Sequence, residues 1–67
     1  MLIAKYKGFS PDKDKLAKKI CKSYQGECVG AEYDGGFRHL IFRFSHTSLE
    51  GGASYKLSNM GYLVEEK

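Results

Sequence analysis

Apolar residues recur at helical spacing in two stretches of the chain. The first stretch forms a single apolar stripe on a helix, because its members lie three or four positions apart: Leu16, Ala17, Ile20, Cys21 and Tyr24. Ser10, Pro11 and Asp12 predict its beginning, since serine caps a helix, proline suits the first helical position and aspartate suits the positive end of the helix dipole. We expect Gly26 to end this helix as a C-terminal glycine.

The second stretch also has one apolar helical face, formed by Leu49, Ala53, Leu57 and Met60. Thr47 and Glu50 match a capping box, in which a threonine side chain caps the helix and the side chain of a glutamate three residues later accepts a hydrogen bond from the backbone N–H of the cap residue. Gly51 and Gly52 each weaken a helix by about 1 kcal/mol relative to alanine. We therefore expect this helix to be short or irregular, and to end at Gly61.

Short alternating or apolar runs predict four strands, at residues 2–6, 27–33, 37–45 and 62–64. Asp34, Gly35 and Gly36 predict a hairpin turn between the second and third strands, because these residue types tolerate positive φ. In either register of that hairpin, the third strand divides its side chains the same way between two faces. One face carries Leu40, Phe42 and Phe44, and the other carries Phe37, His39, Ile41 and Arg43.

The resulting order, β-α-β-β-α-β, predicts an α+β fold of the ferredoxin-like or split-βαβ type. We expect a four-stranded antiparallel sheet with both helices on one face, and with the first and third strands in the centre. The first strand turns either Ile3, Lys5 and Lys7 or the set Leu2, Ala4 and Tyr6 toward the uncovered face, and the pattern leaves this choice open.

Length and composition limit the classes of protein that remain. The 67 residues are 42% hydrophobic and 28% charged, which fits one small folded domain over residues 1–67 and is too apolar for a disordered chain. No apolar run approaches the ~20 residues that cross a bilayer. With two cysteines and no export signal, we expect reduced thiols in a cytoplasmic protein. Homodimerisation is a further source of stability for so short a chain.

The net charge is +3, and its placement is more informative than its size. On the first helix, the face opposite the apolar stripe carries four lysines: Lys15, Lys18, Lys19 and Lys22. Such a face binds phosphates or an acidic protein in one interpretation, and is a solvated outer surface in the other.

The uncovered face of the predicted sheet is the second candidate surface. Phe37, His39, Ile41 and Arg43 combine aromatic, apolar and cationic groups, as do the open sheets of RNA-recognition modules. Residues 36–42 depart from the strand consensus of that family at several positions. The alternative is an interface with a protein partner or with a second copy of the chain.

Metal binding is not predicted, although Cys21, Cys28, His39 and His46 are four possible ligands. Six residues separate the members of each pair, which is wider than zinc sites use, and the alternation places Cys28 on the sheet face opposite Cys21. We therefore expect no metal, no disulfide and no cofactor.

The run Gly35-Gly36-Phe37-Arg38-His39, followed by a strand and by residues 48–53, resembles the HicA-type RNA-cleaving toxins. This resemblance implies a ribonuclease with His39 as the catalytic residue. The sequence offers no positioned partner for a catalytic histidine and no phosphate-binding glycine loop.

We therefore expect a non-enzymatic binding module that recognises nucleic acid or another polyanion through the lysine-rich helix face and the open sheet face. The alternative hypothesis is a small regulator or inhibitor, of the kind encoded by phages and mobile elements, that binds a protein through the exposed sheet face. The toxin-like ribonuclease is the third.

Overall fold

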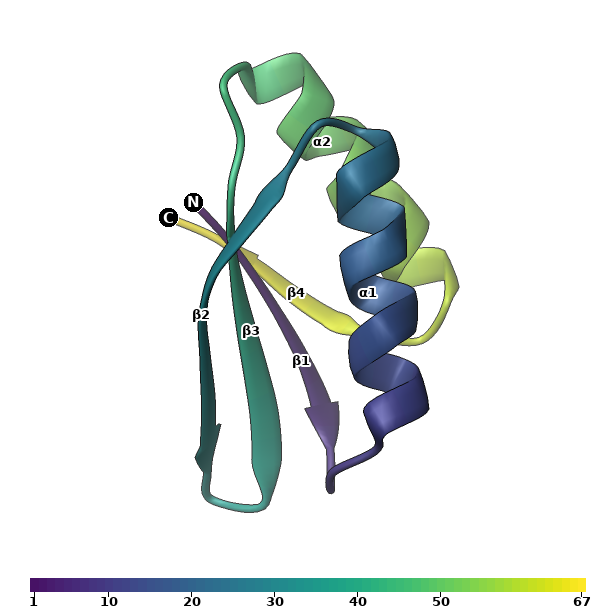
Figure 1. The fold of residues 1–67 in the computed structure, drawn as a ribbon, viewed down its shortest axis with the longest axis vertical. Coiled ribbons are helices and arrows are strands. Elements are labelled where there is room, and N and C mark those ends of the chain that lie inside the picture. Colours follow the sequence, from purple (N-terminus) through teal and green to yellow (C-terminus); the bar gives the residue numbers. More distant parts are fainter.

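The computed structural model describes all of residues 1–67 and contains six elements (Figure 1). In chain order they are β1 (Leu2–Lys7), α1 (Pro11–Ser23), β2 (Glu27–Asp34), β3 (Phe37–Arg43), α2 (Thr47–Asn59) and β4 (Leu63–Glu66). The two helices form one layer and the strands form the other. Neither helix is long and apolar enough to span a membrane.

The sheet confirms the predicted fold class. Its strands lie in the order β2-β3-β1-β4, and all three neighbouring pairs are antiparallel. The two strands that precede the helices, β1 and β3, are therefore central, and β2 and β4 are the edges. β4 begins one residue later than predicted and continues through Glu65 and Glu66, because these residues pair with Ile3 and Leu2.

The core lies between the sheet and the helices, and it decides which face of β1 is covered. Leu2, Ala4 and Tyr6 are buried toward the helices, as are Leu40 and Phe42 of β3. Ile3, Lys5 and Lys7 therefore point to the uncovered face, which settles the choice that the sequence left open. The helices complete the core with Ala17, Ile20, Cys21, Ala53 and Leu57, and Tyr62 closes it at the start of β4.

The β2–β3 hairpin turns at Gly35 and Gly36, which have φ values of 60° and 83°. The register is regular from Asp34 back to Gly30, but Cys28 rather than Val29 lies opposite Phe42. Val29 is thus the extra residue of a β-bulge, which reverses the alternation beyond it. Cys28 shares the helix side of the sheet with the buried Phe42, so its predicted placement on the opposite face is wrong.

Helix α1 begins as predicted, since the Ser10 hydroxyl accepts a hydrogen bond from the Lys13 N–H at 3.3 Å. At its end, the left-handed residue is Gln25, with φ 64°, and the predicted role of Gly26 is wrong. The N–H of Gly26 instead donates to the Cys21 carbonyl at 2.7 Å, as in a Schellman motif. Glycine is needed at position 26 because a Cβ there would overlap the ring of Phe44.

Helix α2 departs from prediction at its beginning. His46 is its N-cap and makes no side-chain cap hydrogen bond, so the predicted capping box does not form. The Glu50 carboxylate instead lies 3.6 Å from the amino group of Met1. Met60, predicted on the apolar face, is 49% exposed, whereas the predicted end at Gly61 is confirmed by its φ of 94°.

The two central glycines of α2 do not interrupt it, contrary to expectation. A Cβ at Gly52 would lie 2.6 Å from Cε2 of Tyr24, whereas a Cβ at Gly51 would meet nothing within 4 Å. Gly52 therefore makes room for the Tyr24 ring, which packs against the core where the end of α1 meets α2.

Candidate functional site

The lysine face of α1, defined as Lys15, Lys18, Lys19 and Lys22, is fully formed in the structure. All four side chains are exposed, because the opposite side of the helix packs on the sheet through Ala17, Ile20 and Cys21. None of the four ammonium groups lies within 4 Å of a carboxylate. The positive charge of this face is therefore available to an external anion.

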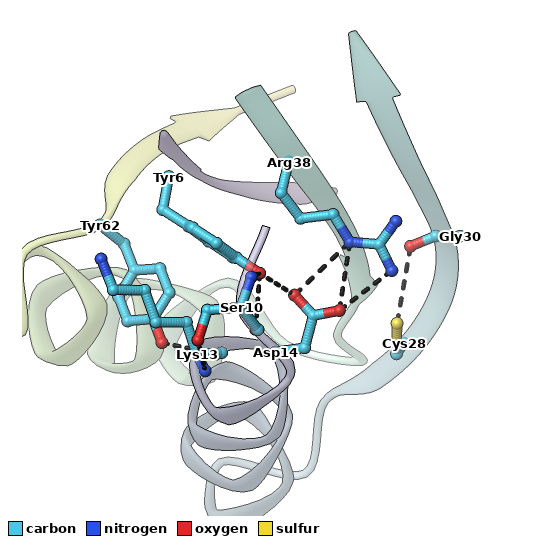
Figure 2. Close-up of polar contacts among 8 residues, drawn as sticks. All are labelled: Tyr6, Ser10, Lys13, Asp14, Cys28, Gly30, Arg38 and Tyr62. Carbon is cyan, nitrogen blue, oxygen red and sulfur yellow. Dashed lines mark hydrogen bonds and ion pairs between the residues drawn. The ribbon is translucent and has the colours of Figure 1, made fainter. Parts of the chain in front are cut away.

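Asp14, one of two acidic residues on the same helix, points away from the lysine face. Its carboxylate lies under β3, where Arg38 donates from Nη2 and Nε to Oδ2 at 3.0 and 3.1 Å (Figure 2). The hydroxyl of Tyr6 donates to Oδ1 at 2.5 Å and accepts from the N–H of Ser10 at 3.0 Å. Burial, followed by the hydrogen bond to Asp14, raises the pKa of Tyr6. Asp14 is thus occupied within the fold and neutralises none of the four lysines.

The guanidinium of Arg38 also lies over the ring of Phe9, with its central carbon 5.1 Å from the ring centroid. Sequence reasoning missed this cluster, although the spacing held a signal. Asp14 precedes Ala17 by three residues and Cys21 by seven, which places a carboxylate on the buried stripe of the helix. Arg38 lies two residues before Leu40 on β3, so both side chains are on the covered face of the sheet. A charged group on a buried face requires a partner.

The uncovered sheet face carries the other predicted residues. Phe37, His39 and Ile41 are half-buried on it, and Arg43 is exposed. The strand registers arrange this face in three rows across β1, β3 and β2: Ile3–Ile41–Gly30, Lys5–His39–Glu32 and Lys7–Phe37–Asp34.

Charges on this sheet face are mixed rather than cationic. Lys5 pairs with Glu65 at 3.1 Å, and Arg43 pairs with Glu27 at 3.6 Å. Glu32 and Asp34 of β2 add two exposed carboxylates that have no ion-pair partner. Mixed charge of this kind gives no general attraction for phosphates.

The structure does not bring the two predicted sets of residues together. The helices cover one face of the sheet (Figure 1). The four lysines lie on the side of α1 opposite its buried residues, and Phe37, His39, Ile41 and Arg43 lie on the sheet face opposite the buried Leu40 and Phe42. The helix layer and the sheet lie between the two sets. A short nucleic-acid strand on the lysines therefore does not also stack on Phe37 and His39.

Neither cysteine forms a disulfide. The Sγ of Cys28 lies 3.5 Å from the carbonyl oxygen of Gly30 (Figure 2). Burial, and then the nearby Cys28, raises the pKa of the Cys21 thiol to about 12. No group of three His, Cys, Asp or Glu side chains is placed to hold a metal ion.

His39, the residue that the toxin resemblance would make catalytic, has Lys5 and Glu32 as its cross-strand neighbours and makes no side-chain hydrogen bond. The one cavity, of about 70 Å³, lies elsewhere, between Tyr6, Lys13, Leu16 and Met60 to Tyr62. Two of its lining residues are hydrogen-bonded to each other, since the Tyr62 hydroxyl donates to the Lys13 carbonyl at 2.6 Å. Comparison with protein families, with curated proteins and with solved structures found no match to this chain.

Proposed function

We propose that the protein binds a nucleic-acid strand, or another polyanion, through the lysine face of α1. The observation that carries this proposal is that four lysines share one exposed helical face without an ion-pair partner. Counterion release from phosphates would supply the affinity.

The distribution of charge supports the helix rather than the sheet. Helix α1 has five lysines and two aspartates, a net charge of +3, which equals that of the whole chain. The four strands together carry four cationic and five acidic residues. An approaching polyanion is therefore attracted to the helix layer.

The size of the face matches a small number of phosphates. Lys15 and Lys22 are seven residues apart, or about 10 Å along the helix at ~1.5 Å per residue. A single strand that places one phosphate on each of the four lysines should show a slope of log K against log salt of about −2.8, since each phosphate contributes about −0.7.

Fluorescence anisotropy with labelled single-stranded RNA and DNA of mixed sequence, between about 50 and 200 mM salt, tests the proposal. The double variant Lys18→Gln/Lys19→Gln should lose about half of the salt slope. The matched control, Arg43→Gln/Lys67→Gln, also removes two positive charges, but outside the lysine face, and should leave the salt slope unchanged.

Binding that does not change with salt, or that responds equally to both double variants, would overturn the proposal. Absence of nucleic-acid binding, together with stoichiometric capture of one protein after nuclease treatment, would favour the alternative hypothesis of a protein-binding regulator.

A further inference from the structure

The uncovered sheet face has a charge pattern that is complementary to itself. β3 runs along its middle and carries Phe37 and Ile41. Lys5 and Lys7 lie on one side of it, on β1, and Glu32 and Asp34 lie on the other side, on β2. Each lysine shares a row with one of these carboxylates, at the same height along the strands. Lys7, Glu32 and Asp34 are exposed and have no ion-pair partner within the chain.

A two-fold axis that runs parallel to β3, midway between two copies, matches this pattern. Rotation about that axis keeps the height along the strands and exchanges the two sides. The β1 strand of one copy therefore faces β2 of its partner. Lys5 then faces Glu32, and Lys7 faces Asp34, and the symmetry forms each contact twice.

The apolar residues fit the same arrangement. Phe37 and Ile41 each lie over their own counterpart at the axis. Ile3 faces Gly30, which has no side chain to oppose it. Both copies have the same hand of twist, so their surfaces stay roughly parallel, at the ~10 Å separation of packed sheets. In the row beyond Ile41, Arg43 would face Arg43 of the second copy. Each of these arginines lies 3.6 Å from Glu27 of its own chain, which offsets its charge.

A two-fold axis between β1 and β3 is the competing arrangement, and the charges disfavour it. In that arrangement Glu32 would face the exposed, apolar Leu63 of the second copy, and Lys5 would face its His39. Asp34 would face no strand of the second copy, because β4 begins only at Leu63. That arrangement pairs none of the unpartnered charges.

We infer that the uncovered sheet face binds a second copy of this chain, with β3 packed on β3 and β1 packed on β2 of the partner. The dimer has four layers, with the sheets inside and the helices outside. It presents the two lysine faces on opposite outer surfaces. An interface of standard size buries about 800 Å² of each partner, and the whole chain exposes 4320 Å².

Charge reversal tests this arrangement, with sedimentation equilibrium as the measurement. Wild-type protein should dimerise. In a dimer of Lys7→Asp, the new carboxylate faces Asp34 of the other copy at both symmetric contacts. In a dimer of Asp34→Lys, the new ammonium group faces Lys7 of the other copy at both contacts. Each variant should raise the dimer dissociation constant by about tenfold or more, because like charges replace opposite charges at two symmetric contacts.

An equimolar mixture of the two variants is the decisive sample, since residue 7 of each chain then faces an opposite charge at position 34 of the other. The mixture should regain the dissociation constant of the wild-type dimer. Lys19→Glu, on the helix side, is the control and should leave dimerisation unchanged. Circular dichroism verifies that each variant is folded.

A wild-type chain that stays monomeric at the highest attainable concentration would overturn the inference. So would single variants that dimerise like wild type, or a mixture that stays monomeric. None of these results depends on whether the lysine face binds a polyanion, so the two proposals fail separately.

Discussion

Arg38 on β3 and Asp14 on α1 connect the sheet to the helix layer through two hydrogen bonds to one carboxylate oxygen, at 3.0 and 3.1 Å. The side chains are only 20% and 11% exposed, so water compensates little for the loss of either partner. Tyr6 and Ser10 extend this contact to β1 and to the start of α1. One ion pair thus fixes the orientation of the helix that carries the lysine face.

Arg38→Met should lower the free energy of unfolding by about 3 kcal/mol, because it leaves the Asp14 carboxylate buried without its cation. Urea denaturation at neutral pH measures the change. The double variant Asp14→Ala/Arg38→Met should be more stable than Arg38→Met, since no unpaired charge then remains. An effect of Arg38→Met below about 1 kcal/mol would show that the pair behaves as a solvent-screened surface contact.

The two central glycines of α2 should respond in opposite ways to the same substitution. Gly51→Ala should stabilise the protein by about 1 kcal/mol, because alanine favours a helix and its methyl group meets no neighbour. Gly52→Ala gains the same helix propensity, but its methyl group would displace the Tyr24 ring and should leave the protein less stable than wild type.

Thermal unfolding of the two variants, each compared with wild type, measures this difference. The two positions are adjacent in the same helix, so propensity alone predicts equal effects. Equal stabilisation by both substitutions would mean that Tyr24 moves aside without cost, and that the contact between the helices does not depend on Gly52.

Gln25→Gly should stabilise the protein by about 0.5–1 kcal/mol, because glycine adopts the left-handed conformation of residue 25 without the strain of a side chain. The comparison variant is Gly26→Ala, which should destabilise the protein, since its methyl group would overlap the Phe44 ring. Chemical denaturation would contradict this assignment if Gln25→Gly lowered stability while Gly26→Ala left it unchanged.

Sequence periodicity predicted the architecture and the position of Lys15, Lys18, Lys19 and Lys22 opposite the buried side of α1, because amphipathic spacing reports which side of a helix is buried. It left the choice between the two faces of β1 open, because both sets contain apolar residues: Leu2, Ala4 and Tyr6 on one face and Ile3 on the other. Lys5 and Lys7 share the face of Ile3, so the set that the structure buries is the more apolar one.

Three local features could not be predicted from composition. No residue type signals the bulge at Val29, and the left-handed residue falls on Gln25 although a glycine follows it. His46 replaces Thr47 as the helix cap without making a side-chain hydrogen bond. The joint use of the two candidate surfaces was also expected, but the lysines face away from the sheet and Phe37 faces away from the helices, so the two surfaces are separate.

The two cysteines should differ sharply in reactivity. Cys28 is exposed and should react with iodoacetamide in the native protein at pH 8, whereas Cys21 is fully buried and should react only after unfolding. Mass spectrometry should therefore detect one modified thiol without denaturant and two with it. Cys28→Ser should leave the native protein unmodified. Equal rates at both thiols would contradict the burial of Cys21.

The raised pKa of Cys21 also determines how stability changes with pH. Its thiol ionises near 9.0 when unfolded and at about 12 when folded, so its contribution to stability is complete below pH 9 and is lost as pH rises toward 12. Burial raises the pKa of Tyr6 and Tyr62 in the same direction, and their contribution is lost above about pH 10. Between about pH 8 and pH 11, wild-type protein should therefore lose more unfolding free energy than Cys21→Ala, because the variant has no thiol to ionise. If both proteins lost the same free energy over this range, the thiol would be as free to ionise in the folded protein as in the unfolded chain.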